Sequence, residues 1–343
     1  MNQDRIDAIA GSLLAGAIGD CLGAATEFKS YDTITRVFGP NGLTEIHPPG
    51  RFTDDTQMTL FTAVGVITAL LDHGRPTSKE WTKAFHEAYL EWLRTQEIRM
   101  PLGDKSGSWL LGESTLYRRE APGMTCLSAL RSGEAGNLED RINDSKGCGG
   151  VMRSAPVGLL LADTHTKEEI YEVSCLSAAV THGHDGGIYP AGALSVMVVD
   201  LMNGESVATA VKNLTGLIPK DLEDRLREAV SYATSQPIEP WSLCDELGQG
   251  WVGDEALAIA VACAVGGSDL EDSLLIAINH DGDTDSTGAI CGNLLGAKLG
   301  VSAIPQRFLD AAPQVPLVAQ VAADCSVFLR GEATLEFAAR YGR

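Results

Sequence analysis

Two short runs of acidic and hydroxyl side chains are the part of this 343-residue sequence best suited to chemistry. The first, TDD at residues 53–55, comes directly before an apolar run, and the second, DGDTDS at residues 281–286, holds three aspartates within five positions. Either run alone could be an acidic helix N-cap, because carboxylates and hydroxyls accept hydrogen bonds from the first N–H groups of a helix and suit its positive end.

Taken together, the two runs are better explained by cations. Adjacent carboxylates repel one another unless a positive charge lies between them. Asp283 and Asp285 can converge only in a loop or a first helical turn, where Gly282 supplies a permissive backbone. Carboxylate and hydroxyl oxygens select Mg²⁺ or Mn²⁺ over zinc, and an EF-hand is excluded because its twelfth-position glutamate is missing. The runs predict a binuclear metal site.

The elements that carry these runs are predicted to be helices. Ile6, Ile9 and Leu13 recur at helical spacing, as do the apolar residues of 170–180, and residues 254–265 are rich in alanine. Alternating β-branched runs are scarce, so the expected fold class is all-α. No Pro- or Ser-rich linker divides the chain, which favours one domain.

Small residues at helical spacing form two rows next to the chemical runs. One row is Gly288, Gly292 and Gly296, and the other consists of Ser12, Gly16, Gly19 and Gly23. Small side chains allow two helix backbones to approach closely. We therefore expect two buried, closely crossing central helices.

The charge balance excludes some classes of partner. The chain has 26 Lys and Arg against 46 Asp and Glu, a net charge of −20. Such a surface repels phosphate backbones, so non-specific nucleic-acid binding is not expected.

The cysteines and apolar runs indicate a cytoplasmic protein without a membrane partner. The eight cysteines include no C-x-x-C pair, which argues against a zinc ribbon or a disulfide scaffold. Asp4 and Asp7 stand where a secretory signal would carry positive charge. The apolar run 56–71 is too short and too polar to span a bilayer.

Over nearly its whole length the chain resembles the ADP-ribosylglycohydrolase family, which includes the dinitrogenase-reductase-activating glycohydrolases. The resemblance rests on the order and spacing of six blocks: GAIGDCLGAATEF (16–28), FTDDTQM (52–58), KGCGGVMRSAP (146–156), THGHDGG (181–187), GWVGDEALA (250–258) and HDGDTDSTGAICGNLLGA (280–297). It implies a single compact multi-helix domain over residues 1–343, with two Mg²⁺ or Mn²⁺ ions at the bottom of a cleft.

The resemblance also assigns roles to residues. It implies catalytic roles for Glu27 and Asp55, with Asp20 as a supporting acid. The metal ligands that it implies are Thr53, Asp54, Asp55, Asp283, Asp285 and Ser286, the last of which is commonly threonine in the family. The substrate-binding residues that it implies are Ser145, Gly147, Cys148, Gly149, Met152 and His182, with residues 145–150 as a diphosphate loop.

Some positions depart from the family pattern. Cys148 replaces an asparagine of many relatives, and Lys146 replaces an aromatic residue that could stack on adenine. Asp281 is an extra acid of unassigned role. We interpret Trp251 and Glu255 as packing and helix support.

The function that the resemblance implies is hydrolysis of the bond between ADP-ribose and a modified target. Arginine-linked mono-ADP-ribose on a protein is the first expectation, and serine-linked, nucleic-acid-linked and O-acetyl-ADP-ribose are alternatives. A catalytically silent ADP-ribose-binding protein, or a dimetal phosphohydrolase using His280 and Asp281 as its HD pair, would be a different class. We expect a monomer that releases ADP-ribose.

Overall fold

Helices make up the regular structure of the chain in a computed structural model that describes residues 3–97 and 107–343. The predicted all-α fold is confirmed: in the described ranges the strand-like pairing is limited to an isolated bridge between Gly147 and Val252. The α-helices are α1 Gln3–Gly23, α2 Tyr31–Phe38, α3 Asp54–His73, α4 Ser78–Glu97, α5 Met124–Arg131, α6 Ala155–Leu161, α7 Lys167–Ala179, α8 Asp185–Met202, α9 Val207–Asn213, α10 Lys220–Ser235, α11 Leu243–Leu247, α12 Gly253–Gly266, α13 Leu270–Ile278, α14 Thr284–Leu299, α15 Gln306–Ala311, α16 Val315–Leu329 and α17 Leu335–Arg340. Short 3₁₀ helices are η1 Trp109–Gly112, η2 Ser114–Leu116, η3 Cys148–Gly150, η4 Pro240–Ser242 and η5 Val301–Ala303.

The periodic segments of the sequence form the expected helices. The run that begins at Ile6 lies in α1, the apolar residues of 170–180 form α7 and its C-cap, and the alanine-rich run forms α12. Helix α7 starts with a capping box, in which Thr166 and Glu169 exchange side-chain to backbone hydrogen bonds. Apolar periodicity and alanine content therefore located these helices, and the capping box adds the physical reason for the start of α7.

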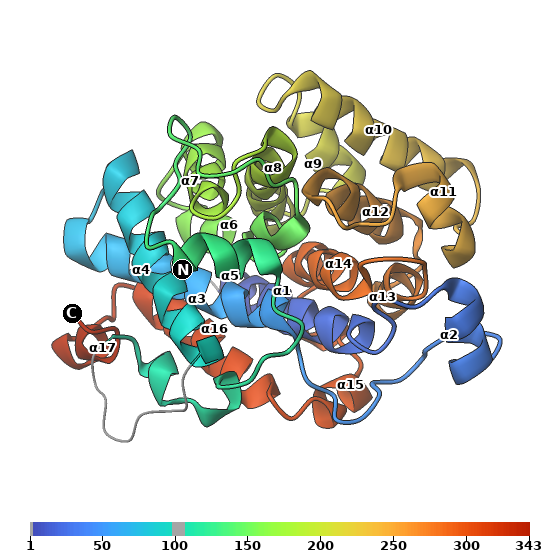
Figure 1. Ribbon diagram of the computed structural model, residues 1–343, viewed down its shortest axis with the longest axis horizontal. Helices are drawn as coiled ribbons and strands as arrows, with labels where there is room; N and C mark the ends of the chain where they lie inside the picture. The colour runs from blue at the N-terminus through green and yellow to red at the C-terminus, as the bar shows by residue number, and fades with distance from the viewer. Residues whose placement is uncertain (1–2, 98–106) are drawn as a thin grey trace.

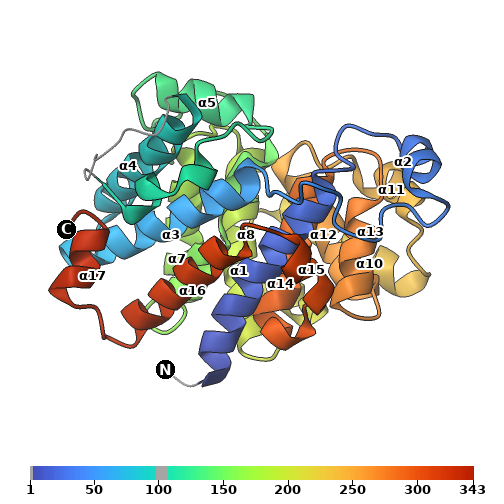
Figure 2. The same ribbon diagram turned by 90° about the horizontal axis from the view of Figure 1, so that it is seen from below.

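Helices α1 and α14 lie side by side at the centre of the molecule (Figures 1 and 2). Helix α14 is buried from Thr284 to Ala297, and α1 is buried from Gly11 to Gly23. Helices α3 and α16 also contact α1, and α8, α12 and α13 contact α14. The two central helices are thus enclosed on all faces except at their ends.

The two rows of small residues bring these central helices into backbone contact, as predicted. A Cβ atom at Gly19 would lie 2.0 Å from the carbonyl oxygen of Gly288, and one at Gly296 would lie 2.2 Å from that of Gly11. Only glycine fits at such distances. Because Gly11 pairs with Gly296 while Gly19 pairs with Gly288, the helices run antiparallel. The end of α1 is therefore fixed beside the start of α14.

Hydrogen bonds lock the register of this helix pair. The Ser12 hydroxyl donates to the Asn293 carbonyl at 2.9 Å, and the Asn293 amide donates back to the Ser12 carbonyl at 2.9 Å. Nearer the end of α1, the Thr284 hydroxyl donates to the Gly23 carbonyl at 2.9 Å. Buried, reciprocal hydrogen bonds of this kind specify one packing arrangement.

Helix α1 is also long and apolar enough to cross a membrane by length and composition. In this structure 83% of its apolar window is buried inside the protein. Its apolar character is accounted for by its place in the core.

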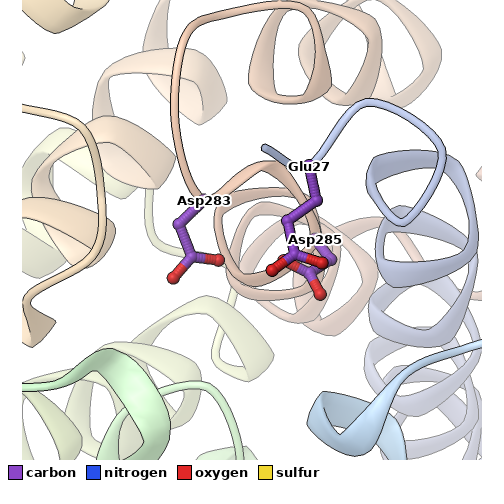
Figure 3. A group of neighbouring side chains, drawn as sticks. All are labelled: Glu27, Asp283 and Asp285. Carbon is purple, nitrogen blue, oxygen red and sulfur yellow. The ribbon is translucent and has the colours of Figure 1, made fainter. Parts of the chain in front are cut away.

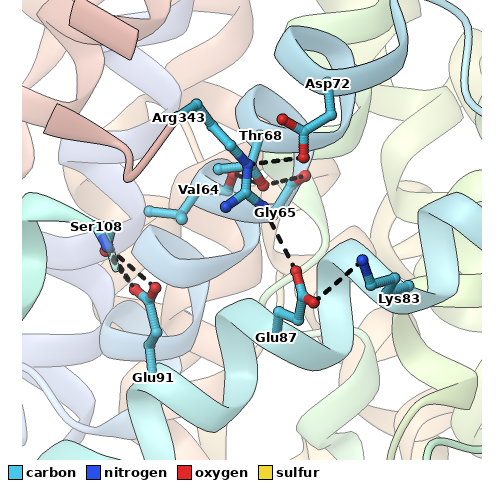
Figure 4. A network of polar contacts seen from close by, with 9 residues as sticks. All are labelled: Val64, Gly65, Thr68, Asp72, Lys83, Glu87, Glu91, Ser108 and Arg343. Carbon is cyan, nitrogen blue, oxygen red and sulfur yellow. Dashed lines mark hydrogen bonds and ion pairs between the residues drawn. The ribbon is translucent and has the colours of Figure 1, made fainter. Parts of the chain in front are cut away.

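The end of the chain is fastened to α3 and α4 by charged side chains (Figure 4). Arg343 lies 2.7 Å from Asp72 of α3 and 3.4 Å from Glu87 of α4. Nearby, Glu91 of α4 accepts a hydrogen bond from the backbone N–H of Ser108 at 3.0 Å. Exposed ion pairs contribute little free energy each, so these contacts position the last turn more than they stabilise the fold.

Candidate active site: a carboxylate cluster at three helix ends

Three helix ends meet at one point and bring the predicted metal ligands together. The turn after α1 carries Glu27, the start of α3 carries residues 53–55, and the start of α14 carries residues 283–286. One carboxylate oxygen from each of Glu27, Asp283 and Asp285 lies within 4.8 Å of the others. Figure 3 shows the carboxyl groups of Glu27 and Asp285 beside one another, with that of Asp283 turned toward them.

The capping interpretation of both acidic runs is correct as far as it goes. Thr53 is the N-cap of α3, and its hydroxyl accepts a hydrogen bond from the N–H of Asp55 at 3.3 Å. Asp283 is the N-cap of α14 and accepts from the N–H of Ser286 at 3.3 Å. Capping nevertheless leaves one oxygen unused: Asp55 Oδ2 is buried and has no hydrogen-bond partner.

Burial and mutual repulsion make the ionised form of the acids in this cluster less favourable. Burial, and then the charges of Asp285 and Asp283, raise the pKa of Glu27 to about 10. Burial, and then the charges of Asp285 and Asp20, hold the pKa of Asp55 well above its ordinary range. Burial and Asp285 likewise raise the pKa of Asp283. A site in which several buried carboxylates repel one another is stabilised by protons or by cations.

The donor set fits hard divalent cations. The side chains at the helix ends present carboxylate and hydroxyl oxygens, and all six predicted ligands are nearly fully buried. Oxygen-only sets of this kind are typical of Mg²⁺ and Mn²⁺. The unpartnered Asp55 Oδ2 is an oxygen that such an ion would satisfy.

Asp20 supports this site by hydrogen bonds to the backbone at the start of α3. It is fully buried in α1, and its carboxylate accepts hydrogen bonds from the N–H of Thr53 at 2.8 Å and the N–H of Thr56 at 3.0 Å. Burial and the charge of Asp285 raise its pKa to about 7. Because both of its oxygens are engaged at the start of α3, Asp20 positions Asp54 and Asp55, as a supporting acid should.

A cleft of about 290 Å³ opens over the carboxylate cluster. The loop 147–149, with Met152 and His182, lines it together with residues 121–126. Phe28 and Trp251 also line it. The sequence did not mark residues 121–126, because they comprise a short connection and only the first residues of α5, too few to show a periodic pattern.

The loop 145–150 is held in shape by its own contacts. The backbone N–H of Gly147 donates to the Ser145 hydroxyl at 3.3 Å, and that of Cys148 donates to the Trp251 carbonyl at 3.3 Å. The Ser145 hydroxyl lies 2.9 Å from that of Thr125. Of the predicted substrate-binding residues, Gly147, Cys148, Gly149, Met152 and His182 line the cleft, whereas Ser145 orders the loop behind them.

His182 packs against the glycines of this loop. A Cβ atom at Gly149 would lie 3.0 Å from the imidazole Cε1, which explains why the loop has glycine there. Burial and the neighbouring Arg153 guanidinium lower the pKa of His182 to about 3, so its ring is neutral. The Thr181 hydroxyl lies 2.9 Å from Nδ1.

The thiol of Cys148 takes part in the cluster. It donates to Asp283 Oδ2 at 2.8 Å, and the Ser286 hydroxyl lies 3.5 Å from its sulfur. Burial and the charges of Asp283 and Asp55 raise the pKa of the thiol well above its ordinary value. Cys148, which replaces the asparagine of many relatives, therefore still provides a hydrogen-bond donor at this position.

The His280–Asp281 pair does not form a metal-binding HD site. His280 Nε2 lies 3.0 Å from the Thr287 hydroxyl and Nδ1 lies 2.9 Å from the Asp281 carbonyl oxygen, so both ring nitrogens are occupied. The Asp281 carboxylate accepts from the N–H of Tyr31 at the start of α2. His280 and Asp281 are therefore not available as the metal ligands that the phosphohydrolase alternative needs. The Asp281 side chain instead holds the start of α2.

The contacts of Trp251 and Glu255 match their interpretation as packing and helix support, and Trp251 in addition lines the cleft. Glu255 supports the backbone, accepting from the N–H groups of Gln249 at 3.0 Å and Gly250 at 3.2 Å. Trp251 is 37% exposed in the cleft, and its ring stacks on Phe28 with centroids 5.2 Å apart. These two residues are 223 positions apart, and nothing in the local pattern of either predicts that they meet.

Comparison with known proteins agrees with this geometry. An ADP-ribosylarginine hydrolase of Serratia proteamaculans is 25% identical, covering 93% of this chain and 79% of its own length. An ADP-ribosyl-[dinitrogen reductase] glycohydrolase of Rhodospirillum rubrum is 24% identical, covering 89% and 90%. A solved structure titled ADP-ribosylglycohydrolase-related protein complex shares the fold, with a TM-score of 0.66 at 24% identity over 94% of this chain and 97% of that one.

The family assignment rests on nearly the whole chain. The sequence model of the family described as ADP-ribosylglycohydrolase matches residues 1–335, a span that contains all three helix ends of the carboxylate cluster and the glycine loop beside it. The chain belongs to the ADP-ribosylglycohydrolase family.

Proposed function

We propose that the chain is a divalent-metal-dependent ADP-ribosyl hydrolase that acts preferentially on arginine-linked mono-ADP-ribose of proteins and releases ADP-ribose. The observation that carries the proposal is the carboxylate cluster at the bottom of the cleft, with its unpartnered Asp55 oxygen. Membership of the family supports the hydrolase class. The arginine linkage is supported by one relative, which is an ADP-ribosylarginine hydrolase.

The proposed metal centre uses six residues from two helix ends. We assign Thr53, Asp54, Asp55, Asp283, Asp285 and Ser286 as the residues that hold two Mg²⁺ or Mn²⁺ ions. Bound there, the ions would polarise substrate oxygens and hold the ribose hydroxyls. The support for this assignment is the oxygen-only donor set and the mutual repulsion that raises the pKa values of Asp55 and Asp283.

The reaction breaks the bond between C1 of the distal ribose and a guanidinium nitrogen. A water oxygen bonds to C1, the nitrogen leaves with the bonding electron pair, and a water proton balances its charge. C1 acquires oxocarbenium character during this exchange, which nearby carboxylates stabilise. We assign the proton movement to Glu27, because its carboxyl faces Asp283 and Asp285 without belonging to either helix that carries the ligands. Asp55 is the second candidate for this role.

The diphosphate is assigned to the glycine loop. Backbone N–H groups in such loops bind phosphate oxygens well. The N–H groups of Gly147 and Cys148 already have partners within the protein, so we assign the phosphate contact to that of Gly149. Met152 and the neutral His182 form the floor and wall of the same subsite.

A hydrolysis panel tests the function. Purified protein with Mg²⁺ or Mn²⁺ is incubated with peptides carrying ADP-ribosyl-arginine or ADP-ribosyl-serine, with ADP-ribosylated DNA and with O-acetyl-ADP-ribose. We expect ADP-ribose to be released fastest from the arginine-linked peptide. Faster release from another substrate would reassign the linkage. Tight binding of ADP-ribose with no turnover of any substrate would support the silent-binder alternative and overturn the enzymatic proposal.

We also propose that residues 1–343 act as one domain, as a monomer in the cytoplasm. The reasons are the absence of a linker-like segment in the sequence and the cysteines, all eight of which are free. Size-exclusion chromatography with light scattering checks the monomer, and an early-eluting dimer would contradict it.

A further inference from the structure

The cleft beside the carboxylate cluster is lined in part by sulfur-containing side chains. Cys148, Met152 and Cys126 all line it. The sulfur of Cys148 lies 2.8 Å from Asp283 Oδ2, and the Ser286 hydroxyl lies 3.5 Å from that sulfur and 3.9 Å from the sulfur of Met152. Soft and hard donor atoms therefore meet around Ser286.

The thiol of Cys148 faces a carboxylate, since it donates to Asp283 Oδ2. A second acid, Asp55, lines the same cleft as this thiol. Asp55 is 3% exposed, lines the cleft, and has an oxygen without a hydrogen-bond partner. The thiol of Cys148, the Asp283 carboxylate and the Ser286 hydroxyl lie in contact, and Asp55 lines the same cleft. Such a donor set suits a cation with affinity for both sulfur and oxygen.

The other cleft cysteine lies in the opposite electrostatic environment. The Arg153 guanidinium donates to the sulfur of Cys126 at 3.4 Å. Arg153 is fully buried, so its positive charge is not screened by water and repels cations from Cys126. The two thiols of this cleft therefore form a matched pair, one beside carboxylates and the other beside a cation.

We propose that Cys148, Asp283 and Ser286 form a site for a thiophilic divalent cation such as Zn²⁺ or Cd²⁺, at the edge of the hard-ion centre. Binding forms a sulfur–metal bond and releases the thiol proton to solvent. Because Asp283 would serve both sites, occupancy by a thiophilic cation excludes Mg²⁺ or Mn²⁺. The inference rests on the proposed function in one respect: exclusion of the hard ion makes the thiophilic cation an inhibitor of the hydrolase.

Cadmium binding gives a direct readout that needs no activity. Full-length protein is freed of metal with EDTA, dialysed and titrated with Cd²⁺, and the ultraviolet sulfur-to-cadmium charge-transfer band is recorded. We expect the first equivalent to produce the band in the wild-type protein and in Cys126→Ser. In Cys148→Ser, which keeps a hydroxyl donor for Asp283, the band should be lost and the Cd²⁺ affinity should fall by at least about 10-fold.

Two results would overturn the site. One is no band in the wild-type protein, and the other is a first-equivalent band that survives in Cys148→Ser. Cys148→Ala, with its thermal unfolding measured alongside, serves as a second variant: a folded Cys148→Ala that keeps the band has the same consequence. Addition of excess Mn²⁺ should remove the wild-type band, and an unchanged band would refute the sharing of Asp283.

Inhibition then tests the consequence for the enzyme. Each variant is compared with its own rate in Mn²⁺ alone, and Zn²⁺ is added stepwise. We expect Cys148→Ser to need at least about 10-fold more Zn²⁺ for half inhibition than the wild-type protein, and Cys126→Ser to match the wild type. Equal sensitivity of all three would refute the inhibitory role. If no ADP-ribosyl substrate is hydrolysed, the proposed function fails, while the charge-transfer titration still decides the cation site.

Discussion

Alanine at Gly23 should disturb the metal centre more than it disturbs the fold, because Gly23 lies where α1 meets the first turn of α14. A Cβ atom there would be 2.2 Å from the carbonyl oxygen of Thr284 and 2.5 Å from the Cα of Asp285. Ordinary contact begins at 3.4 Å, so the two backbones would have to separate by about 1.2 Å along the shorter contact. That displacement acts on Asp285 itself.

Gly11 provides a matched control on the same helix. A Cβ atom at Gly11 would lie 2.4 Å from the Gly296 carbonyl oxygen, a clash of similar size. Gly11 precedes Gly23 by 12 residues, or about 18 Å of helix. Each substitution should cost about 1–3 kcal/mol through overpacking. For 343 residues this lowers the melting temperature by about 1–4 °C, from the usual entropy of unfolding per residue.

Calorimetric titration with Mn²⁺ at 25 °C, where both variants remain folded, separates the two effects. Gly23→Ala should lose about 10- to 100-fold in Mn²⁺ affinity, the range seen when the supports of metal ligands are disturbed. Gly11→Ala should stay within about 3-fold of the wild-type protein, since its clash is remote from the ligands. Equal losses in both variants would show general destabilisation. Wild-type affinity in Gly23→Ala would show that the helix crossing does not set the carboxylate spacing.

Three further predictions concern the charge of the cluster. Asp55→Asn should abolish Mn²⁺ binding and turnover while raising the stability of the metal-free protein by about 1–3 kcal/mol, because it replaces a buried carboxyl among neighbouring acids by a group that carries no charge. A lower melting temperature of the metal-free variant would contradict this. The folded state holds the proton of Asp20 more tightly than the unfolded state, since its pKa rises from 3.8 to about 7. The free energy of unfolding of the metal-free protein, measured by urea denaturation, should therefore fall by up to about 4 kcal/mol as the pH rises from 4 to 7. That of Asp20→Asn should fall much less, and an equal fall would refute the assignment. EDTA should abolish the activity, and Mg²⁺ or Mn²⁺ should restore it. At a free ion concentration of 100 times the dissociation constant, the folded state should gain about 2.7 kcal/mol of stability. Restoration of activity by zinc alone would indicate a different site.

The fold and the acidic runs could be predicted because their signals are local. Apolar periodicity located α1 and α7, alanine content located α12, and the small-residue rows predicted the crossing of α1 with α14. Aspartates next to hydroxyls mark a helix start by their capping chemistry alone. In both acidic runs the N-cap and the predicted metal ligands fall on neighbouring residues, so one local pattern indicated both.

The rest of the site depends on contacts between distant parts of the chain. Glu27 is a single acid after α1, and no spacing connects it with Asp283; only the resemblance selected it. The rings of Phe28 and Trp251 stack although they belong to two separate loops. Phe28 follows α1 of the antiparallel helix pair, and Trp251 precedes Val252, which forms a bridge with Gly147. Periodicity describes which face of a helix is buried, but it does not say which loops meet across a core.

Counting the carboxylate oxygens that the protein itself satisfies distinguishes the supporting acid from the proposed ligands. Both oxygens of Asp20 accept hydrogen bonds at the start of α3, so it has none free for a cation. Asp283 gives one oxygen to the N–H of Ser286 and the other to the weak thiol donor of Cys148, which a cation can displace. Asp55 keeps Oδ2 buried without any partner. A buried charged oxygen left unpaired is costly, so its retention is better explained by binding than by folding, and Asp55 is the residue on which the metal assignment most depends.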